Sequence, residues 1–227
     1  MSLSTSFRPR QLALALDHAE SYAREDFLSG ACNEGALQLI DGWPDWPAST
    51  VALIGPEGSG KTHLATMWAA AAGARIVSAH ALGTAELPSA LATGALVVED
   101  AEATQDERVL LHLINLAGEE KASLLLTART LPAAWPVAIP DLVSRLRALP
   151  VAMLLTPDDA MLRALIVKLA ADRQLAVDES VVRYLSTRIE RSFAAARAAV
   201  IALDREALRQ RRPATRALAA EILRDGS

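Results

Sequence analysis

The feature that most constrains the fold of this chain is a glycine-rich octapeptide with the sequence Gly55-Pro56-Glu57-Gly58-Ser59-Gly60-Lys61-Thr62. It matches the pattern G-x-x-x-x-G-K-[S/T] at every position, follows an apolar run and precedes an Ala-rich segment of helical character. Glycines let such a loop curl until its backbone N–H groups point at phosphate oxygens. We predict a phosphate-binding loop, in preference to a glycine-rich turn with a chance lysine. Lys61 is expected to reach the β- and γ-phosphates, and Thr62 to bind Mg²⁺.

Apolar runs of strand length recur along the chain and alternate with segments of helical spacing. The five predicted strands are Val51–Gly55, Ala74–Ser78, Ala95–Asp100, Ala122–Ala128 and Leu149–Leu155. Each is almost continuously apolar, which is typical of parallel strands buried on both faces. Lys61–Ala72 and Glu107–Glu119 are predicted crossover helices. The pattern predicts an α/β fold with a five-stranded parallel sheet.

The character of the chain changes after Pro157, where no further strand is predicted. The remaining helices are expected at Pro157–Arg173, Asp178–Ile189, Ser192–Gln210 and Thr215–Leu223, with Asp178 as an N-cap. We therefore divide the chain into a tail (1–20), an α/β subdomain (21–156) and a small all-α lid (157–227). Before the first strand, Asn33–Ile40 is a predicted helix, and Trp43 and Trp46 are predicted packing anchors.

Composition limits the classes of function. The 227 residues carry 23 Lys and Arg against 27 Asp and Glu, a net charge of −4, so any DNA contact must be local. The single cysteine, Cys32, cannot form an internal disulfide and is expected to be a small apolar filler. No apolar run approaches the length of a membrane span. We expect a cytoplasmic protein with no membrane contact.

A pair of carboxylates, Glu99 and Asp100, ends the third predicted strand. This pattern resembles a Walker B element, in which the first acid helps to hold Mg²⁺ and the second orients the attacking water. We assign Glu99 to the metal and Asp100 to the water. Because Glu is longer than the common Asp, hydrolysis is expected to be slow. The alternative is two solvated acids at a strand end.

The order of these motifs resembles the AAA+ group, and within it the DnaA family of bacterial replication initiators, over about Phe27 to Leu223. The segments that carry the resemblance are the P-loop with His63-Leu64, then Glu99-Asp100, Leu124–Thr127, Leu142–Leu146 and Ala194–Val200. The resemblance implies an AAA+ P-loop three-layer domain followed by a helical lid. The initiators continue into a helix-turn-helix DNA-binding domain, whereas this sequence ends at the lid.

The resemblance assigns roles to further residues. Thr127 matches sensor 1, although the flanking Ala128 and Arg129 depart from the family's usual Ser and Asp; a strand-end threonine chosen for β propensity is the alternative. Arg145 matches the arginine finger that one subunit offers to its neighbour's nucleotide, with Arg147 as a competitor for that role. His63 matches the helix after the P-loop and Arg197 matches the sensor-2 arginine. The other lid arginines are expected mostly on a solvated helix face.

A short peptide near the N-terminus resembles the clamp-binding motif Q-L-x-L-x-L. It consists of Gln11, Leu12, Leu14 and Leu16 with intervening alanines. In such peptides the glutamine amide satisfies polar groups at a pocket rim, and the leucines fill an apolar cleft. The alternative is a short helix or strand docked on the chain's own domain.

Together these features imply a regulatory AAA+ protein with ATP or ADP and Mg²⁺ as cofactors. The resemblance implies that it docks on the DNA polymerase sliding clamp and stimulates ATP hydrolysis by the initiator DnaA, with a homodimer as a further expectation and DNA contact indirect or weak. One alternative is an initiator-like ATPase or helicase loader acting directly on DNA. Another is a small-molecule kinase, which the lid and the trans-acting arginine disfavour.

Overall fold

The structure is a computed structural model that describes residue 24, residues 27–83 and residues 87–225. The predicted clamp-binding peptide Gln11–Leu16 lies outside these residues. The strands are β1 (Thr50–Ile54), β2 (Arg75–Ser78), β3 (Ala95–Glu99), β4 (Ser123–Ala128) and β5 (Val151–Met153). The helices are α1 (Glu34–Asp41), α2 (Lys61–Ala72), α3 (Leu87–Ala90), α4 (Glu107–Glu119), α5 (Pro140–Ala148), α6 (Asp159–Asp172), α7 (Glu179–Ser186), α8 (Phe193–Gln210) and α9 (Arg216–Asp225).

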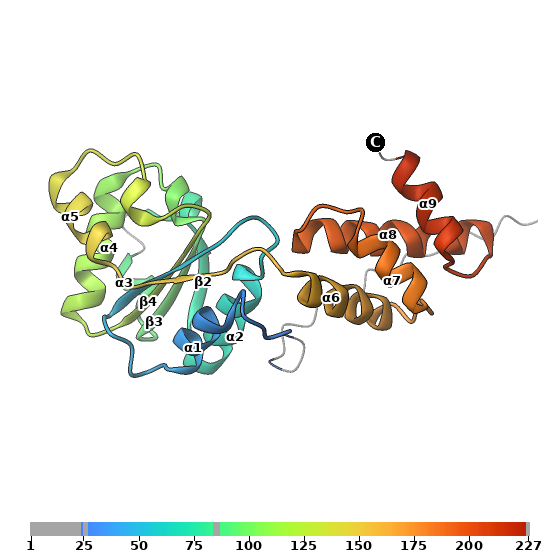
Figure 1. The fold of residues 1–227 in the computed structure, drawn as a ribbon. Helices are drawn as coiled ribbons and strands as arrows, with labels where there is room; N and C mark the ends of the chain where they lie inside the picture. The colour runs from blue at the N-terminus through green and yellow to red at the C-terminus, as the bar shows by residue number, and fades with distance from the viewer. Residues whose placement is uncertain (1–23, 25–26, 84–86, 226–227) are drawn as a thin grey trace, which may run out of the picture.

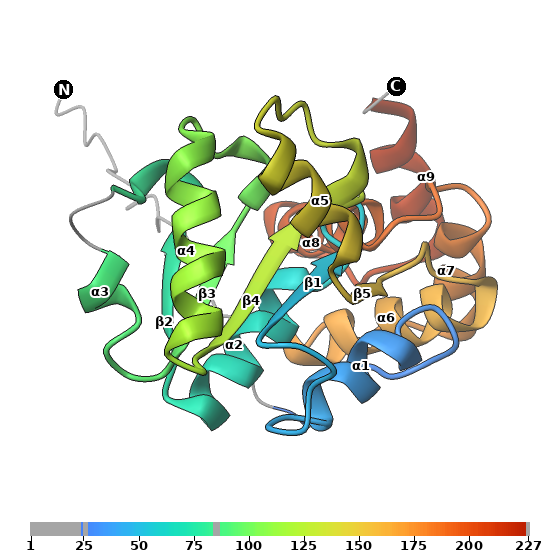
Figure 2. The ribbon, with the colours of Figure 1, turned by 90° about the vertical axis from the view of Figure 1, so that its left-hand side faces the viewer.

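The strands form one parallel sheet in the order β2-β3-β4-β1-β5, with β1 paired to β4 from Thr50 opposite Leu124 to Ile54 opposite Ala128. Figure 2 shows the sheet with α4 lying across one of its faces. Because all strands run in the same direction, the loops that follow β1, β3 and β4 emerge at the same edge. The P-loop and the predicted acidic and sensor residues all lie in or beside these loops.

Successive side chains of the central strands point to opposite faces of the sheet, so the core has two layers. Ala52 and Ile54 of β1 face the core shared with α3, α4 and α5, whereas Val51 and Leu53 face the core shared with α1 and α2. Helices thus cover both faces of the sheet, and the sheet with its two helical layers forms a three-layer α/β domain.

The lid is a bundle of helices with its own core. The buried residues of this core are Leu162, Ile166, Ala170, Val181, Val182, Leu185, Ala196, Ala199, Val200, Leu203, Ala207, Ala214, Leu218 and Ala219. Figure 1 shows α6 to α9 beside the α/β domain, joined to it by the segment after β5. Asp178 caps α7 as predicted, because its side chain accepts a hydrogen bond from Val181 N–H at 2.9 Å.

Most predicted elements are confirmed, and α2 and α4 have the predicted bounds. The prediction that every strand is buried on both faces is wrong for β2 and β5, which lie at the two edges of the sheet. Ile76 in β2 and Met153 in β5 are more than 40% exposed, at 42% and 47%. Residues 140–148 form a helix, α5, that the sequence reasoning did not identify.

Three tryptophans anchor the segment that leads into β1. Trp46 stacks on Trp68 of α2 with ring centroids 4.7 Å apart, and Trp43 meets the same ring edge-on at 6.4 Å. The predicted role of Trp43 and Trp46 as packing anchors is confirmed. Among the residues that the structure describes, no helix combines the length and the apolar character needed to cross a bilayer.

Candidate nucleotide-binding site

The P-loop connects the end of β1 to the start of α2 through two left-handed glycines. Gly58 has a φ of 70° and Gly60 a φ of 99°, backbone conformations that residues with a side chain rarely adopt. Lys61 begins α2 and is 8% exposed. The predicted motif therefore has the strand–loop–helix context that phosphate binding requires.

Lys61 lies folded back over its own loop. Its Nζ donates hydrogen bonds to the carbonyl oxygens of Gly55 at 2.7 Å and Pro56 at 2.9 Å. Burial lowers the pKa of Lys61 and the positive charge of Arg129 lowers it further, whereas nearby carboxylates act in the opposite direction. The ammonium is thus held inside the loop, next to a second cation.

A buried hydroxyl in the P-loop lacks a hydrogen-bond partner. Ser59 is 2% exposed, and its Oγ makes no hydrogen bond within the described part of the chain. Leaving such a group unsatisfied costs about 1–3 kcal/mol. A phosphate oxygen is a suitable acceptor for this hydroxyl, so the residues present fit an anionic ligand.

The acidic pair and the sensor-1 threonine lie together at the ends of adjacent strands. β3 ends at Glu99, and Asp100 leaves the strand with a φ of 52°, so the predicted extension of the strand to Asp100 is wrong. The backbone N–H of Asp100 donates to Oγ1 of Thr127 at 3.3 Å. Thr127 is 2% exposed at the corresponding end of β4. The structure thus brings together two sites that the sequence predicted separately.

Thr62 and Glu99 present the oxygen ligands that were predicted to hold Mg²⁺. Thr62 is exposed at the start of α2, and Glu99 is partly exposed at the end of β3. A hydroxyl and a carboxylate are hard donors of the kind that Mg²⁺ prefers. The donor set therefore fits the predicted ion.

The first turn of α8 lies against the P-loop. A Cβ placed on Gly58 would be 2.9 Å from the Cβ of Ala194 and 3.1 Å from its backbone nitrogen. Ser192 caps this helix by accepting a hydrogen bond from Ala195 N–H at 3.0 Å. The positive end of an 18-residue helix therefore faces the loop. Arg197, predicted as sensor 2, follows one turn later on α8 and is exposed.

Arg145 lies on α5, whose buried residues Leu142 and Leu146 fix the helix against the sheet. Its side chain is 44% exposed and its Nε lies 3.5 Å from Oδ1 of Asp141, one turn earlier. Arg147 is also exposed in the last turn of the same helix. The guanidinium of Arg145 is thus held at the surface, where another chain can reach it.

Sequence reasoning missed the loop before α1. Asn33 is 2% exposed, accepts a hydrogen bond from Gly30 N–H at 2.9 Å and donates to Leu28 O at 2.8 Å. The ring of Phe27 meets the ring of His63 in α2 edge-on, with centroids 5.3 Å apart. The loop therefore lies beside the helix that begins at the P-loop. The only signal in the sequence was an asparagine at the start of a predicted helix.

A second residue that was not predicted for the site is Arg129, which follows β4. Its Nη1 lies 2.9 Å from Oε2 of Glu57 in the P-loop, and its backbone N–H donates to Oε1 of Glu102 at 2.6 Å. The sequence showed Arg129 only as a departure from the family pattern. Its proximity to Glu57 results from the order of the strands, which is not visible in local sequence.

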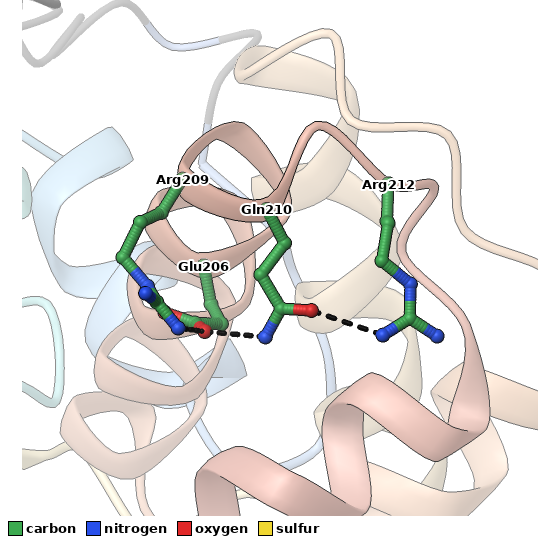
Figure 3. Close-up of polar contacts among 4 residues, drawn as sticks. All are labelled: Glu206, Arg209, Gln210 and Arg212. Carbon is green, nitrogen blue, oxygen red and sulfur yellow. Dashed lines mark hydrogen bonds and ion pairs between the residues drawn. The ribbon is translucent and has the colours of Figure 1, made fainter.

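The arginines at the end of α8 form part of a network of hydrogen bonds, which Figure 3 shows. Glu206 accepts hydrogen bonds from Nε of Arg209 at 2.8 Å and from Gln210, whose Oε1 in turn accepts from Arg212 at 3.0 Å. Arg188 and Arg216 lie 4.9 and 5.4 Å from the centre of the Tyr184 ring. These contacts hold the four arginines against other residues of the lid.

A small cavity of about 140 Å³ has no P-loop residue in its lining. It is lined by residues of the turn after β3, the start of α4 and the segment before α5. Glu107 on its wall accepts hydrogen bonds from the backbone N–H groups of Ala138 and Ile139, both at 2.9 Å. The carboxylate of Glu107 thus holds the chain before α5 in place.

Comparisons with known proteins agree with this architecture. The structure is similar to domain III of the replication initiation protein DnaA from Thermotoga maritima, with a TM-score of 0.74 and 19% identity over 90% of this chain and 96% of that one. It is also similar to the replication initiator DnaA bound to AMPPCP and single-stranded DNA, with a TM-score of 0.67 and 16% identity over 84% of this chain and 68% of that one.

A third similar structure is the RuvB Holliday junction branch migration motor of Thermotoga maritima, with a TM-score of 0.66 and 16% identity over 83% of this chain and 66% of that one. No protein-family model matches the sequence, and no curated protein matches it. The structural similarities establish that the chain has the AAA+ fold of DnaA domain III and RuvB.

Proposed function

We propose that this chain is an adenine-nucleotide-binding AAA+ regulator that stimulates ATP hydrolysis by the replication initiator DnaA. In this role it resembles Hda, a truncated DnaA homologue that associates with the sliding clamp. The observation that carries the proposal is the placement of Arg145 at the surface of α5, 44% exposed and paired only loosely with Asp141. A guanidinium in this position is available to a nucleotide bound by another chain.

Nucleotide binding is supported by the P-loop itself. In the proposed complex Lys61 exchanges its bonds with the carbonyls of Gly55 and Pro56 for bonds with phosphate oxygens. The Ser59 hydroxyl, which has no hydrogen bond within the described residues, gains an acceptor. The N-terminus of α8 adds partial positive charge from the lid side.

The remaining site residues divide the chemistry among them. Thr62 and Glu99 would hold Mg²⁺, which neutralises phosphate charge when it is bound. Asp100 would orient a water molecule, and Thr127 fixes the backbone at Asp100 through its hydrogen bond. Because Asp100 is exposed and Glu99 replaces the usual aspartate, the proposed hydrolysis by this chain is slow.

Stimulation of a partner follows from the chemistry of Arg145. Its planar guanidinium would stabilise charge that develops on the γ-phosphoryl oxygens of the partner's ATP, and fingers supplied in trans accelerate turnover by ~10³ to 10⁵. Clamp docking through Gln11, Leu12, Leu14 and Leu16 would bring the two chains together on DNA. That part of the proposal rests on the sequence motif, since the peptide lies outside the described residues.

The test is the rate at which purified DnaA hydrolyses its bound ATP in the presence of clamp loaded on DNA. The intact chain is compared with Arg145→Ala, with Arg147→Ala as a matched control on the same turn, and with Gln11→Ala/Leu12→Ala. We expect stimulation by the intact chain and the Arg147 variant, and its loss in the other two. Nucleotide binding by each variant, measured separately, should be retained.

The opposite results are equally informative. If Arg147→Ala abolishes stimulation and Arg145→Ala does not, the finger is assigned to the wrong arginine. If the intact chain gives no stimulation, the regulatory function is wrong. Salt-sensitive binding of the chain to single-stranded DNA, together with nucleotide-driven oligomerisation, would then favour the initiator-like ATPase or helicase loader.

A further inference from the structure

Arg129 is held at the meeting point of three loops. It follows β4, the central strand, whose neighbours in the sheet are β3 and β1. Its backbone N–H donates to Oε1 of Glu102 in the turn after β3, and its side chain contacts Glu57 in the loop after β1. Arg129 therefore links the P-loop to the acidic edge of the site, which we define as Glu99, Asp100 and Glu102 at the end of β3.

Arg129 and Lys61 place two cations at the P-loop. The Lys61 ammonium donates to the loop carbonyls of Gly55 and Pro56. The Arg129 guanidinium contacts the carboxylate of Glu57. A phosphate that binds at the loop would therefore lie near two cations. Arg129 is paired with Glu57, and Lys61 donates hydrogen bonds to loop carbonyls.

The ion pair between Glu57 and Arg129 is weak enough for a phosphate group to replace Glu57 as the partner of Arg129. The Nη1–Oε2 distance is 2.9 Å, yet the side chains of Arg129 and Glu57 are 55% and 74% exposed. Ion pairs this exposed contribute little to stability and are readily broken. A phosphate group can accept two parallel bonds from a guanidinium, so it competes effectively with a solvated carboxylate.

We propose that Arg129 is a nucleotide-binding residue that exchanges Glu57 for the terminal phosphate of a bound nucleoside triphosphate, and thereby favours triphosphate over diphosphate. Arg129 follows Thr127 by two residues and its side chain contacts Glu57 of the P-loop, so it lies on the side of the loop where Lys61 would meet the terminal phosphate. The Glu57 carboxylate competes with the terminal phosphate for Arg129 and so limits the increase in affinity for the triphosphate. This inference rests on the proposed binding of nucleotide at the P-loop.

The two partners are predicted to affect binding in opposite directions. Removing Arg129 withdraws a cation and should weaken binding of the triphosphate, whereas neutralising Glu57 removes a competitor and a repelling charge and should strengthen it. If the pair served only to hold the P-loop in shape, both changes would weaken binding. The sign of the Glu57 effect therefore separates the proposal from a purely structural role.

The experiment is equilibrium titration of the full chain with Mg·AMPPCP and with Mg·ADP. For Arg129→Ala we expect about tenfold weaker binding of AMPPCP, as for loss of one charge-assisted bond, and a smaller change for ADP. Arg129→Lys, which keeps the charge without the planar fork, should fall between this variant and the intact chain. Glu57→Gln should bind AMPPCP about two- to fivefold more tightly, a gain that disappears when Arg129→Ala is added.

Arg209→Ala is the control, because Arg209 forms an exposed ion pair with Glu206 near the far end of α8, several turns away from the contact between Ala194 and the P-loop. It should leave both affinities unchanged. Equal losses of AMPPCP and ADP affinity in Arg129→Ala, or weaker AMPPCP binding in Glu57→Gln, would overturn the proposal while the P-loop remains a nucleotide site. Failure of the intact chain to bind either nucleotide would overturn the proposed nucleotide binding as well.

Discussion

The backbone N–H of Asp100 donates a hydrogen bond to the side-chain Oγ1 of Thr127 at 3.3 Å, and this bond joins the ends of β3 and β4. Asp100 has a φ of 52°, a conformation that is uncommon for a residue other than glycine. The bond therefore helps to hold a strained residue at the acidic edge of the site.

Replacing Thr127 with valine keeps the shape of a buried side chain but removes the acceptor for Asp100 N–H. We expect a loss of about 1 kcal/mol in the free energy of unfolding, measured by urea denaturation. The rate of ATP hydrolysis by this chain should fall in this variant because Asp100 is less well fixed. Thr127→Ser keeps the hydroxyl and is expected to retain the hydrolysis rate; equal rates in both variants would argue against a role for the bond.

Gly58 combines a left-handed backbone with a close approach to Ala194. Gly58→Ala should lower the free energy of unfolding by about 1–2 kcal/mol from backbone strain alone and should also displace the first turn of α8. We expect weaker nucleotide binding as a result. Gly73→Ala is a matched control, because Gly73 has a φ of 64° with open space around it. If both variants bind nucleotide equally well, contact with the lid is unimportant for binding.

Asn33 is predicted to be essential for the loop before α1. Asn33→Ala removes a donor and an acceptor that satisfy Leu28 O and Gly30 N–H. The expected cost is about 2 kcal/mol in the free energy of unfolding, since a buried amide and two backbone contacts are lost. Gln38→Ala, which removes an exposed 3.3 Å bond to Glu34, should cost much less. Similar stabilities for the two variants would contradict the structure of this loop.

How well the sequence predicts an element depends on whether the interactions that determine it are local in sequence. The bounds of α2 and α4 were predicted because local spacing and composition determine them, and the P-loop because its motif lies within eight residues. The sequence does not predict the exposure of β2 and β5, because their position at the edges depends on the order of all five strands in the sheet.

The same reasoning explains what was missed at the site. The 2.9 Å ion pair between Glu57 and Arg129 depends on β4 lying beside β1 in the sheet, and nothing local to either residue indicates it. The contact between Gly58 and Ala194 depends on how the lid folds back. The sequence does not predict α5 because this helix is short and begins with a proline, a residue that marks turns as well as first helical positions.

The network at the end of α8 makes stability depend on pH. Hydrogen bonds from Arg209 and Gln210 lower the pKa of Glu206 from 4.5 to about 2 (Figure 3). A carboxyl whose pKa is lowered by folding stabilises the native state above its unfolded pKa, and this contribution is lost as pH falls through the folded pKa. The stability advantage of the intact chain over Glu206→Gln should therefore be constant above about pH 5 and should shrink from pH 4.5 towards 2.

Arg209→Met provides the companion measurement, because Arg209 is the largest cause of the shift. It should raise the pKa of Glu206 and remove most of the same pH dependence. Urea unfolding of the three proteins at several values of pH between 7 and 3 gives the comparison. A difference between intact chain and Glu206→Gln that does not change with pH would contradict the assigned network.

The most direct measurement of the central claim is calorimetric titration of the full chain with Mg·ADP and Mg·ATP, beside Lys61→Ala. We predict one nucleotide bound per chain, with affinity at least about tenfold weaker in the variant because the buried ammonium is lost. Retained folding of the variant, checked by circular dichroism, assigns the loss to the site. Absence of binding to the folded intact chain at millimolar nucleotide, or equal binding by Lys61→Ala, would contradict the account.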